Sequence, residues 1–101
     1  MISEILASAR AEIAEAAEFY DAADPPLGDE FVAEINDTIQ RICERPYAWT
    51  ALSSRTRRCL TRRYPFAVIY QVRGNTVLVM SVMHTSRSPN SWKRRLRRRD
   101  W

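Results

Sequence analysis

The sequence predicts an α+β fold in which an N-terminal helical hairpin packs on a small, mainly antiparallel sheet, followed by a short C-terminal helix. Two observations support this. Apolar residues recur every three or four positions over roughly the first 45 residues, as on one face of a helix, and alternate from about Arg57 onward, as in strands. At 101 residues the chain has material for one modest core. We therefore expect residues 1–101 to form a single domain.

The N-terminal half predicts two helices and one ambiguous segment. Residues 2–6 are compatible with a first strand or with the start of the first helix. Residues 8–20 carry an apolar stripe, with acidic residues such as Glu12 on the other faces. The segment from Asp21 to Pro26 should break this helix, and Asp24 before two prolines is a natural N-cap. The second helix should end near residue 45, because Pro46 disfavours helix at the residue before it.

The C-terminal half predicts a three-stranded meander. Residues 46–55 read as a loop, held down by Tyr47, Trp49 and Leu52. Strands are expected at 57–63, 66–72 and 77–83, and the last should be central because it is apolar on both faces. Residues 73–76 supply the turn between the last two strands, through Gly74 and Asn75. The final helix should begin at Ser88 and carry Trp92.

Charge divides the chain in two. Residues 1–54 hold 11 acidic and 3 basic side chains, whereas residues 55–101 hold 13 basic side chains and one acidic. Fifteen of the sixteen basic residues are arginine, whose guanidinium fork binds phosphate or carboxylate with two parallel hydrogen bonds. This asymmetry indicates an anionic partner, although part of the basic charge must neutralise the acidic half within the fold.

Several classes of protein are disfavoured. No apolar run approaches the roughly 20 residues of a membrane helix, and no secretory signal is visible. Cys43 and Cys59 are isolated, and the chain has one histidine, so we expect no metal and no cofactor. Reduced thiols without a secretory signal lead us to expect a cytoplasmic protein that does not contact membranes.

Two segments resemble a known family. RRYPFAVIYQV and VLVMSVMHTSRSPNSWKRR are similar to the R-R-F-P-Y-x-I-x-Y strand and the H-x-x-R-x-P-x-x-W ending of the RelE/ParE superfamily of type II toxin–antitoxin toxins. The hairpin ARAEIAEAAEFYDAADPPLGDEFVAEINDTIQRICERP, with its tyrosine and its G-x-x-F helix start, resembles the same family. The combination points to the ParE-like, plasmid-stabilisation branch.

The resemblance implies a growth-inhibiting toxin that a cognate antitoxin holds inactive in an oligomeric complex. It leaves the target open, because ParE-like members poison DNA gyrase and RelE-like members cleave mRNA on the ribosome. A third alternative is a basic binding module of this fold without toxicity.

Metal-free cleavage of RNA needs cations around a phosphate and a group that transfers protons. His84 and Arg87 are the candidate catalytic pair. Against cleavage, the region where RelE-like ribonucleases carry a basic residue reads Tyr64-Pro65-Phe66, and their catalytic tyrosine is matched by Trp92, whose indole transfers no proton. These departures favour an inhibitor that is not an enzyme.

The candidate residues for binding the target or the antitoxin are mainly arginines. They are Arg57, Arg58, Arg62, Arg63, Arg87 and Trp92. We expect the antitoxin to lay a helix or strand across the basic sheet and supply carboxylates to these arginines.

Structural explanations exist for the same residues. The arginines of residues 57–63 also suit a solvated edge strand. His84 ends a face with Leu78, Met80 and Val82 and suits a strand-end hydrogen bonder. Arg87 could pair with Glu12 or Glu15, and Trp92, Phe66 and Tyr70 suit the core.

Overall fold

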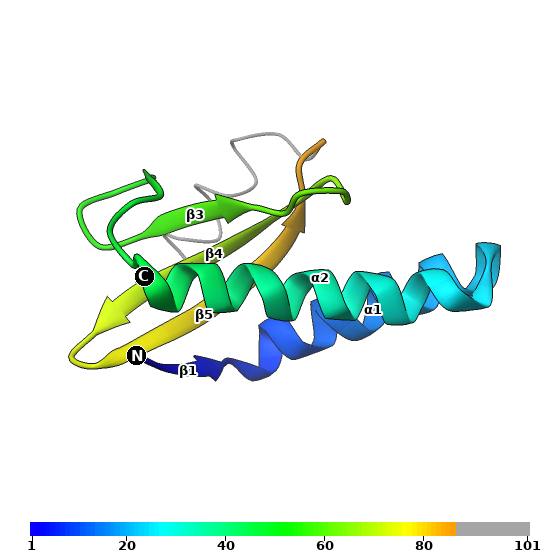
Figure 1. The fold of residues 1–101 in the computed structure, drawn as a ribbon, viewed down its shortest axis with the longest axis horizontal. Helices are drawn as coiled ribbons and strands as arrows, with labels where there is room; N and C mark the ends of the chain where they lie inside the picture. Colours follow the sequence, from blue (N-terminus) through cyan, green and yellow to red (C-terminus); the bar gives the residue numbers. More distant parts are fainter. Residues whose placement is uncertain (87–101) are drawn as a thin grey trace.

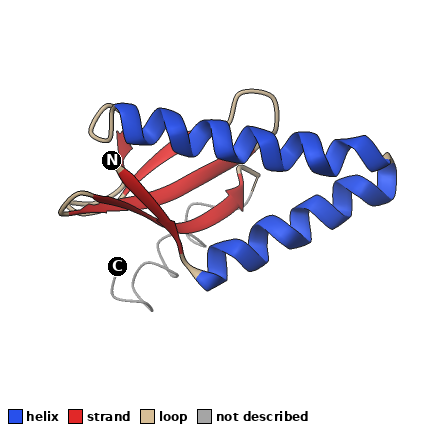
Figure 2. Ribbon diagram, turned by 60° about the horizontal axis from the view of Figure 1, so that its bottom comes forward, coloured by secondary structure: helices blue, strands red, loops and turns tan. Residues whose placement is uncertain are grey.

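Two helices cover one face of a five-stranded mixed sheet (Figures 1 and 2). The structure, a computed structural model, describes residues 1–86. The strand order is β1-β5-β4-β3-β2; β1 runs parallel to β5, and the other neighbours are antiparallel. The elements are β1 Ile2–Ile5, α1 Ala7–Ala23, α2 Pro25–Glu44, β2 Thr50–Ala51, β3 Arg57–Leu60, β4 Phe66–Arg73 and β5 Thr76–His84.

The predicted α+β architecture is confirmed, and the ambiguous first segment is a strand. Strand β5 lies between β1 and β4, as its two apolar faces predicted. The predicted helix from Ser88, with Trp92, lies outside the described residues.

The junction of the hairpin differs from the prediction. Helix α1 continues to Ala23, past the break expected at Asp21. Asp24 occupies the N-cap position, but its side chain makes no capping hydrogen bond. The cap comes from Asp21, whose Oδ1 accepts the backbone N–H of Gly28 at 2.9 Å. A Cβ on Gly28 would lie 2.1 Å from that oxygen, so this cap requires glycine.

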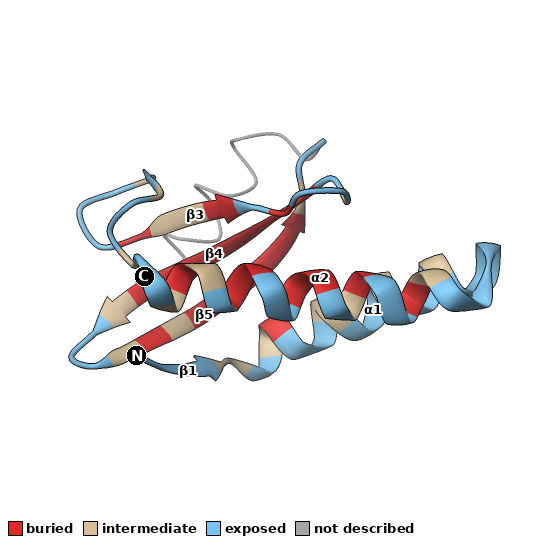
Figure 3. Cartoon of the chain, in the orientation of Figure 1, coloured by how far each residue is buried: buried red, intermediate tan, exposed pale blue. Residues whose placement is uncertain are grey.

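Helix α2 supplies most of the helical side of the core. Phe31, Ile35, Ile39 and Ile42 are buried against the strands, whereas α1 has one fully buried residue, Ala9 (Figure 3). The expectation that Phe66 and Tyr70 belong to the core is confirmed, since they are 8% and 0% exposed. Ring contacts extend this core toward one end of the sheet through Tyr20, Phe31, Tyr64 and Phe66.

The segment between α2 and β4 departs from the prediction at three points. The expected loop contains the short strand β2. Tyr47 does not pack the loop down, because it is 66% exposed; Trp49 and Leu52 are half-buried and do pack. Strand β3 ends at Leu60 rather than at Arg63, because the following residues turn to bond with α2.

A β-bulge changes the face of the last strand. Ile69 pairs with Ser81, but the next residue, Tyr70, pairs with Val79, so Met80 is an extra residue in β5. The predicted common face of Leu78, Met80, Val82 and His84 is therefore wrong. Val82 lies in the helix-side core, and His84 stands opposite Phe66 on that same side.

Strand β5 is longer than β1, and α1 covers the remainder of its edge. The last pair of the two strands is Ile5 with Val79. Beyond it, the hydroxyl of Ser8 donates to the carbonyl of Met80 at 3.4 Å. One turn later, Glu12 Oε1 accepts the backbone N–H of Val82 at 3.1 Å. Two side chains four residues apart on a helix thus replace a strand partner at the bulge.

Candidate functional site

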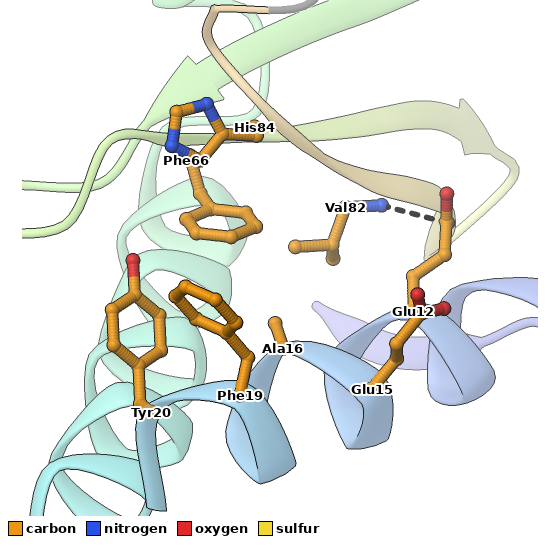
Figure 4. Close-up of a pocket in the computed structure, with 8 residues that line it drawn as sticks. All are labelled: Glu12, Glu15, Ala16, Phe19, Tyr20, Phe66, Val82 and His84. Atoms are coloured by element: carbon orange, nitrogen blue, oxygen red, sulfur yellow. Dashed lines mark hydrogen bonds between the residues drawn. The ribbon is translucent and has the colours of Figure 1, made fainter. Parts of the chain in front are cut away.

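His84 opens onto a groove between α1 and the ends of β4 and β5 (Figure 4). The groove has a volume of about 290 Å³. Its lining residues are Glu12, Glu15, Ala16, Phe19, Tyr20, Phe66, Val82 and His84. The bulge is what places His84 here, because without the extra residue the histidine would face the other side of the sheet.

The histidine ring is held by its neighbours. The backbone N–H of Ser86 donates to His84 Nδ1 at 3.1 Å, and the Ser86 hydroxyl lies 2.6 Å from the same nitrogen. The ring meets Phe66 edge-on, with centroids 5.2 Å apart. Because Nδ1 accepts a hydrogen bond, the proton of the neutral ring lies on Nε2. His84 is thus a strand-end hydrogen bonder.

The rim of this groove is acidic. Glu12 accepts hydrogen bonds from the Ser81 hydroxyl, at 2.9 and 3.1 Å to its two oxygens, as well as from Val82. Glu15 lies one turn away and is exposed. Within the described residues, no arginine or lysine lines this groove. A phosphate in this groove would therefore face the carboxylates of Glu12 and Glu15, which repel it.

The predicted arginine cluster is divided between different contacts. Arg57 Nη1 donates to the carbonyls of Tyr47 and Trp49, at 3.2 and 2.8 Å, and its guanidinium lies 5.6 Å from the Tyr47 ring centroid. Arg57 therefore ties the loop after α2 to the sheet. Arg58 is half-buried, pairs with Ile69 and Thr50 in the sheet, and points to the opposite face, as neighbouring strand residues do.

Arg62 and Arg63 lie in the β3–β4 loop and border a shallow pocket of about 380 Å³ against α2. Arg63 Nε stands 3.5 Å from Glu34 Oε1, although the arginine side chain is 73% exposed. Arg62 is exposed. Of the four arginines of residues 57–63, Arg62 and Arg63 line one pocket, while Arg57 and Arg58 do not. Arg87 and Trp92 lie outside the described residues.

Glu34 is the polar residue that the sequence analysis missed. It is 8% exposed, and its Oε2 accepts the backbone N–H groups of Arg63 and Tyr64 at 2.9 and 2.7 Å. The signal was available, because Glu34 follows Phe31 by three residues and lies on the apolar stripe of α2. A glutamate on such a stripe needs buried partners, and the loop amides are those partners.

The described residues contain no group of three or more His, Cys, Asp or Glu side chains arranged to hold a metal ion. Within the same residues, no helix is long and apolar enough to span a membrane.

Comparison with known proteins decides the family. Residues 4–89 match the family model described as "ParE toxin of type II toxin-antitoxin system, parDE". The chain belongs to the ParE toxin family. The resemblance to the RelE/ParE superfamily is thereby confirmed, and membership in a type II toxin–antitoxin system implies an antitoxin as partner. None of the curated proteins matches the chain.

Two solved structures show the same fold. A chain from a structure titled "Chromosomal ParDE TA system from P. aeruginosa" is 16% identical, with a TM-score of 0.75 over 85% of this chain and 97% of that one. The isolated E. coli RelE toxin is 15% identical, with a TM-score of 0.55 over 95% of this chain and 96% of that one. In backbone geometry this ParE-family toxin is more similar to the chain from the ParDE structure than to RelE.

Proposed function

We propose that this ParE-family toxin arrests growth by binding DNA gyrase, without hydrolysing RNA, and that a cognate antitoxin neutralises it in an oligomeric complex. Support for the target comes from the ParE-like fold and from the departures at residues 64–66 and at Trp92. Support for a contact mechanism comes from the chemistry of the groove around His84.

That groove is the observation that carries the proposal. RNA cleavage without metal requires cations around the scissile phosphate, next to the group that moves the proton. His84 instead opens onto a groove that Glu12 and Glu15 line from the α1 side, and no cation from residues 1–86 lines that groove. Arg57 and Arg63 already bond to protein groups elsewhere. The described part of the chain therefore favours an inhibitor over a ribonuclease.

A supercoiling assay tests the target directly. Purified toxin is mixed with gyrase, relaxed plasmid and ATP, and we expect supercoiling to be lost in proportion to toxin. Addition of the antitoxin first should restore it, which controls for contaminants. In parallel, programmed ribosomes should show no codon-specific cuts in the message. Cuts in the message with undisturbed supercoiling would establish the RelE-like alternative instead.

A second test addresses His84. Expression of His84→Ala without the antitoxin should still arrest growth, because this residue bonds Ser86 and opens onto a groove lined by carboxylates rather than by phosphate-binding cations. Wild type is the positive control for growth arrest, and an empty vector is the negative control. Full loss of arrest by a variant that still folds would make His84 a functional residue and would reopen the enzymatic alternative.

The antitoxin should engage arginines of β3 and of the β3–β4 loop by charge. We propose that a segment that folds on binding supplies carboxylates to Arg58, Arg62 and Arg63. Arg63 already has Glu34 as a partner, so Arg62, which is exposed, should contribute more. Affinity for an antitoxin peptide should fall most for Arg62→Ala and least for Arg10→Ala on α1. An unchanged affinity in the triple Arg58, Arg62 and Arg63 alanine variant would remove this idea.

A further inference from the structure

The end of the sheet opposite His84 contains a second cleft, of about 220 Å³. The cleft exists because β4 extends beyond the end of β3 (Figure 1). The terminal pair of the two strands is Arg57 with Tyr70, but β4 continues to Arg73. The lining residues are Tyr47, Ser54, Arg55, Arg57, Tyr70, Gln71, Val72 and Arg73. Three arginines therefore share one notch, which we call the arginine cleft.

Side-chain hydrogen bonds orient two of these arginines. Arg73 donates through Nε and Nη2 to Gln71 Oε1, at 3.0 and 2.7 Å. Gln71 in turn donates through Nε2 to the hydroxyl of Thr56 at 3.0 Å, and both residues are buried. Arg57 is fixed by the carbonyls of Tyr47 and Trp49. The guanidinium groups of Arg57 and Arg73 are therefore held in position before a ligand binds.

The third arginine lies on a braced turn. The Ser53 hydroxyl accepts the backbone N–H groups of Arg55 and Thr56, at 3.3 and 3.1 Å. The Thr56 carbonyl accepts those of Leu52 and Ser53, at 2.8 and 3.2 Å. The backbone that carries Arg55 is therefore held at the mouth of the cleft, while its exposed side chain stays in solvent.

Within residues 1–86, no acidic side chain balances the charge of the cleft. The part of the chain that the structure describes contributes no aspartate or glutamate to the cleft lining. The salt bridges within residues 1–86 join Arg41 to Asp37 and Arg63 to Glu34, so none of them involves a cleft arginine. Three positive groups around one notch repel one another, and an anion bound among them removes that repulsion.

The lining indicates which anion. A partner helix needs an apolar groove, and among residues 1–86 Val72 is the one aliphatic residue that lines the cleft. The cleft does offer an aromatic ring at its rim: Tyr47 is 66% exposed, beside the guanidinium of Arg57. Arginines that follow a backbone, combined with an exposed ring on which a base stacks, are typical of single-stranded nucleic-acid sites.

We propose that the arginine cleft binds single-stranded nucleic acid, with a backbone phosphate between Arg55, Arg57 and Arg73 and a base stacked on Tyr47. This site is separate from the groove of His84 and does not depend on which target the toxin inhibits. It would let the toxin hold a nucleic-acid strand with one end of the sheet.

Fluorescence anisotropy with a labelled thymidine hexanucleotide tests the proposal on the full chain. The double variant Arg55→Ala/Arg73→Ala should bind at least about tenfold more weakly, and the slope of log affinity against log salt should shrink by about one. Tyr47→Ala should weaken binding about fivefold or more, whereas Tyr47→Phe should bind like wild type.

The matched control is Arg10→Ala/Arg62→Ala, which removes the same charge outside the cleft. It should keep affinity within about twofold of wild type. The basic sequence of residues 93–99 is the same in all variants, so its nonspecific attraction cancels in the comparison. Urea unfolding of each variant checks that the fold is retained.

Localisation completes the test. In ¹H–¹⁵N spectra, the hexanucleotide should shift the side-chain Nε signals of Arg55, Arg57 and Arg73 before others. Equal losses in the cleft and control variants would overturn the proposal, because binding would then follow net charge alone. Tighter binding of a hexaglutamate peptide than of the hexanucleotide would also overturn it, in favour of a carboxylate partner.

Discussion

Helices α1 and α2 each hold the sheet through one glutamate, and the two contacts differ in burial. Glu34 of α2 is 8% exposed and bonds two amides of the β3–β4 loop. Glu12 of α1 is half-buried and bonds Ser81 and Val82 at the β5 bulge. Both carboxylates accept backbone N–H groups that no strand pairs. The α2 contact, being further from water, should contribute more to stability.

The largest expected effect is that of Glu34→Ala. Loss of its carboxylate leaves two loop amides without an acceptor, and each charge-assisted bond contributes about 1.5 to 3 kcal/mol. We expect the free energy of unfolding in urea to fall by about 3 kcal/mol. Glu30→Ala, on an exposed position of the same helix, should change it by less than about 0.5 kcal/mol. Similar values for the two variants would contradict the role of Glu34.

Glu12→Ala should have a smaller effect. We expect a loss of about 1 to 2 kcal/mol, because the Glu12 side chain is only half-buried and its hydrogen bonds compete with water. The amide of Val82 should exchange faster, and the ring signals of His84 should shift as the bulge relaxes. Glu15→Ala is the control, since Glu15 lines the same groove from an exposed position. If both variants perturb Val82 equally, the contact assigned to Glu12 is wrong.

The third prediction concerns the hydrogen bond by which Tyr70 holds the segment after α2, and it is tested with Tyr70→Phe at high pH. The Tyr70 hydroxyl donates to the carbonyl of Pro46, just after α2, at 2.6 Å, and its loss should cost about 1 kcal/mol at pH 7. Burial raises the pKa of Tyr70 above its ordinary value of 10.0. The folded state therefore holds this proton more tightly, so its stabilising contribution is present below pH 10 and is lost as pH rises further.

Unfolding of wild type and Tyr70→Phe at pH 7 and at pH 10.5 measures this contribution. Stability of the wild type should decline more steeply across that interval. Equal declines would show that Tyr70 does not contribute to the alkaline loss.

The smallest effect is kinetic and concerns the thiols. Burial raises the pKa of Cys59 above 9.0, against the opposing charges of Arg41 and Arg62, and the residue is 1% exposed. Cys43 on α2 is half-buried. In the native protein, a thiol reagent should therefore modify Cys43 first. Glu34→Ala should speed the modification of Cys59, because β3 then opens more often. An unchanged rate of Cys59 modification would show that the Glu34 contact with the β3–β4 loop does not control the opening of β3.

Local patterns predicted the elements well for physical reasons. A helix of α2's length repeats its apolar stripe several times, and strands β4 and β5 alternate or stay apolar over eight and nine residues. Strand β2, with two residues, is too short to show any period, and the four residues of β1 left a strand and a helix start equally compatible with the sequence. The acceptor of the α2 cap was misassigned because Asp21 and Asp24 look equivalent until the turn is built.

The candidate sites were less predictable, because they depend on pairing between distant segments. The sequence by itself determined the α+β class, the hairpin and meander, the uneven charge and the residues that carry the family resemblance. Only the tertiary structure decided the bulge at Met80, which turns His84 toward an acidic groove, and the overhang of β4, which gathers Arg55, Arg57 and Arg73. Strand register and strand length are set by partners far along the chain, and no local pattern contains them.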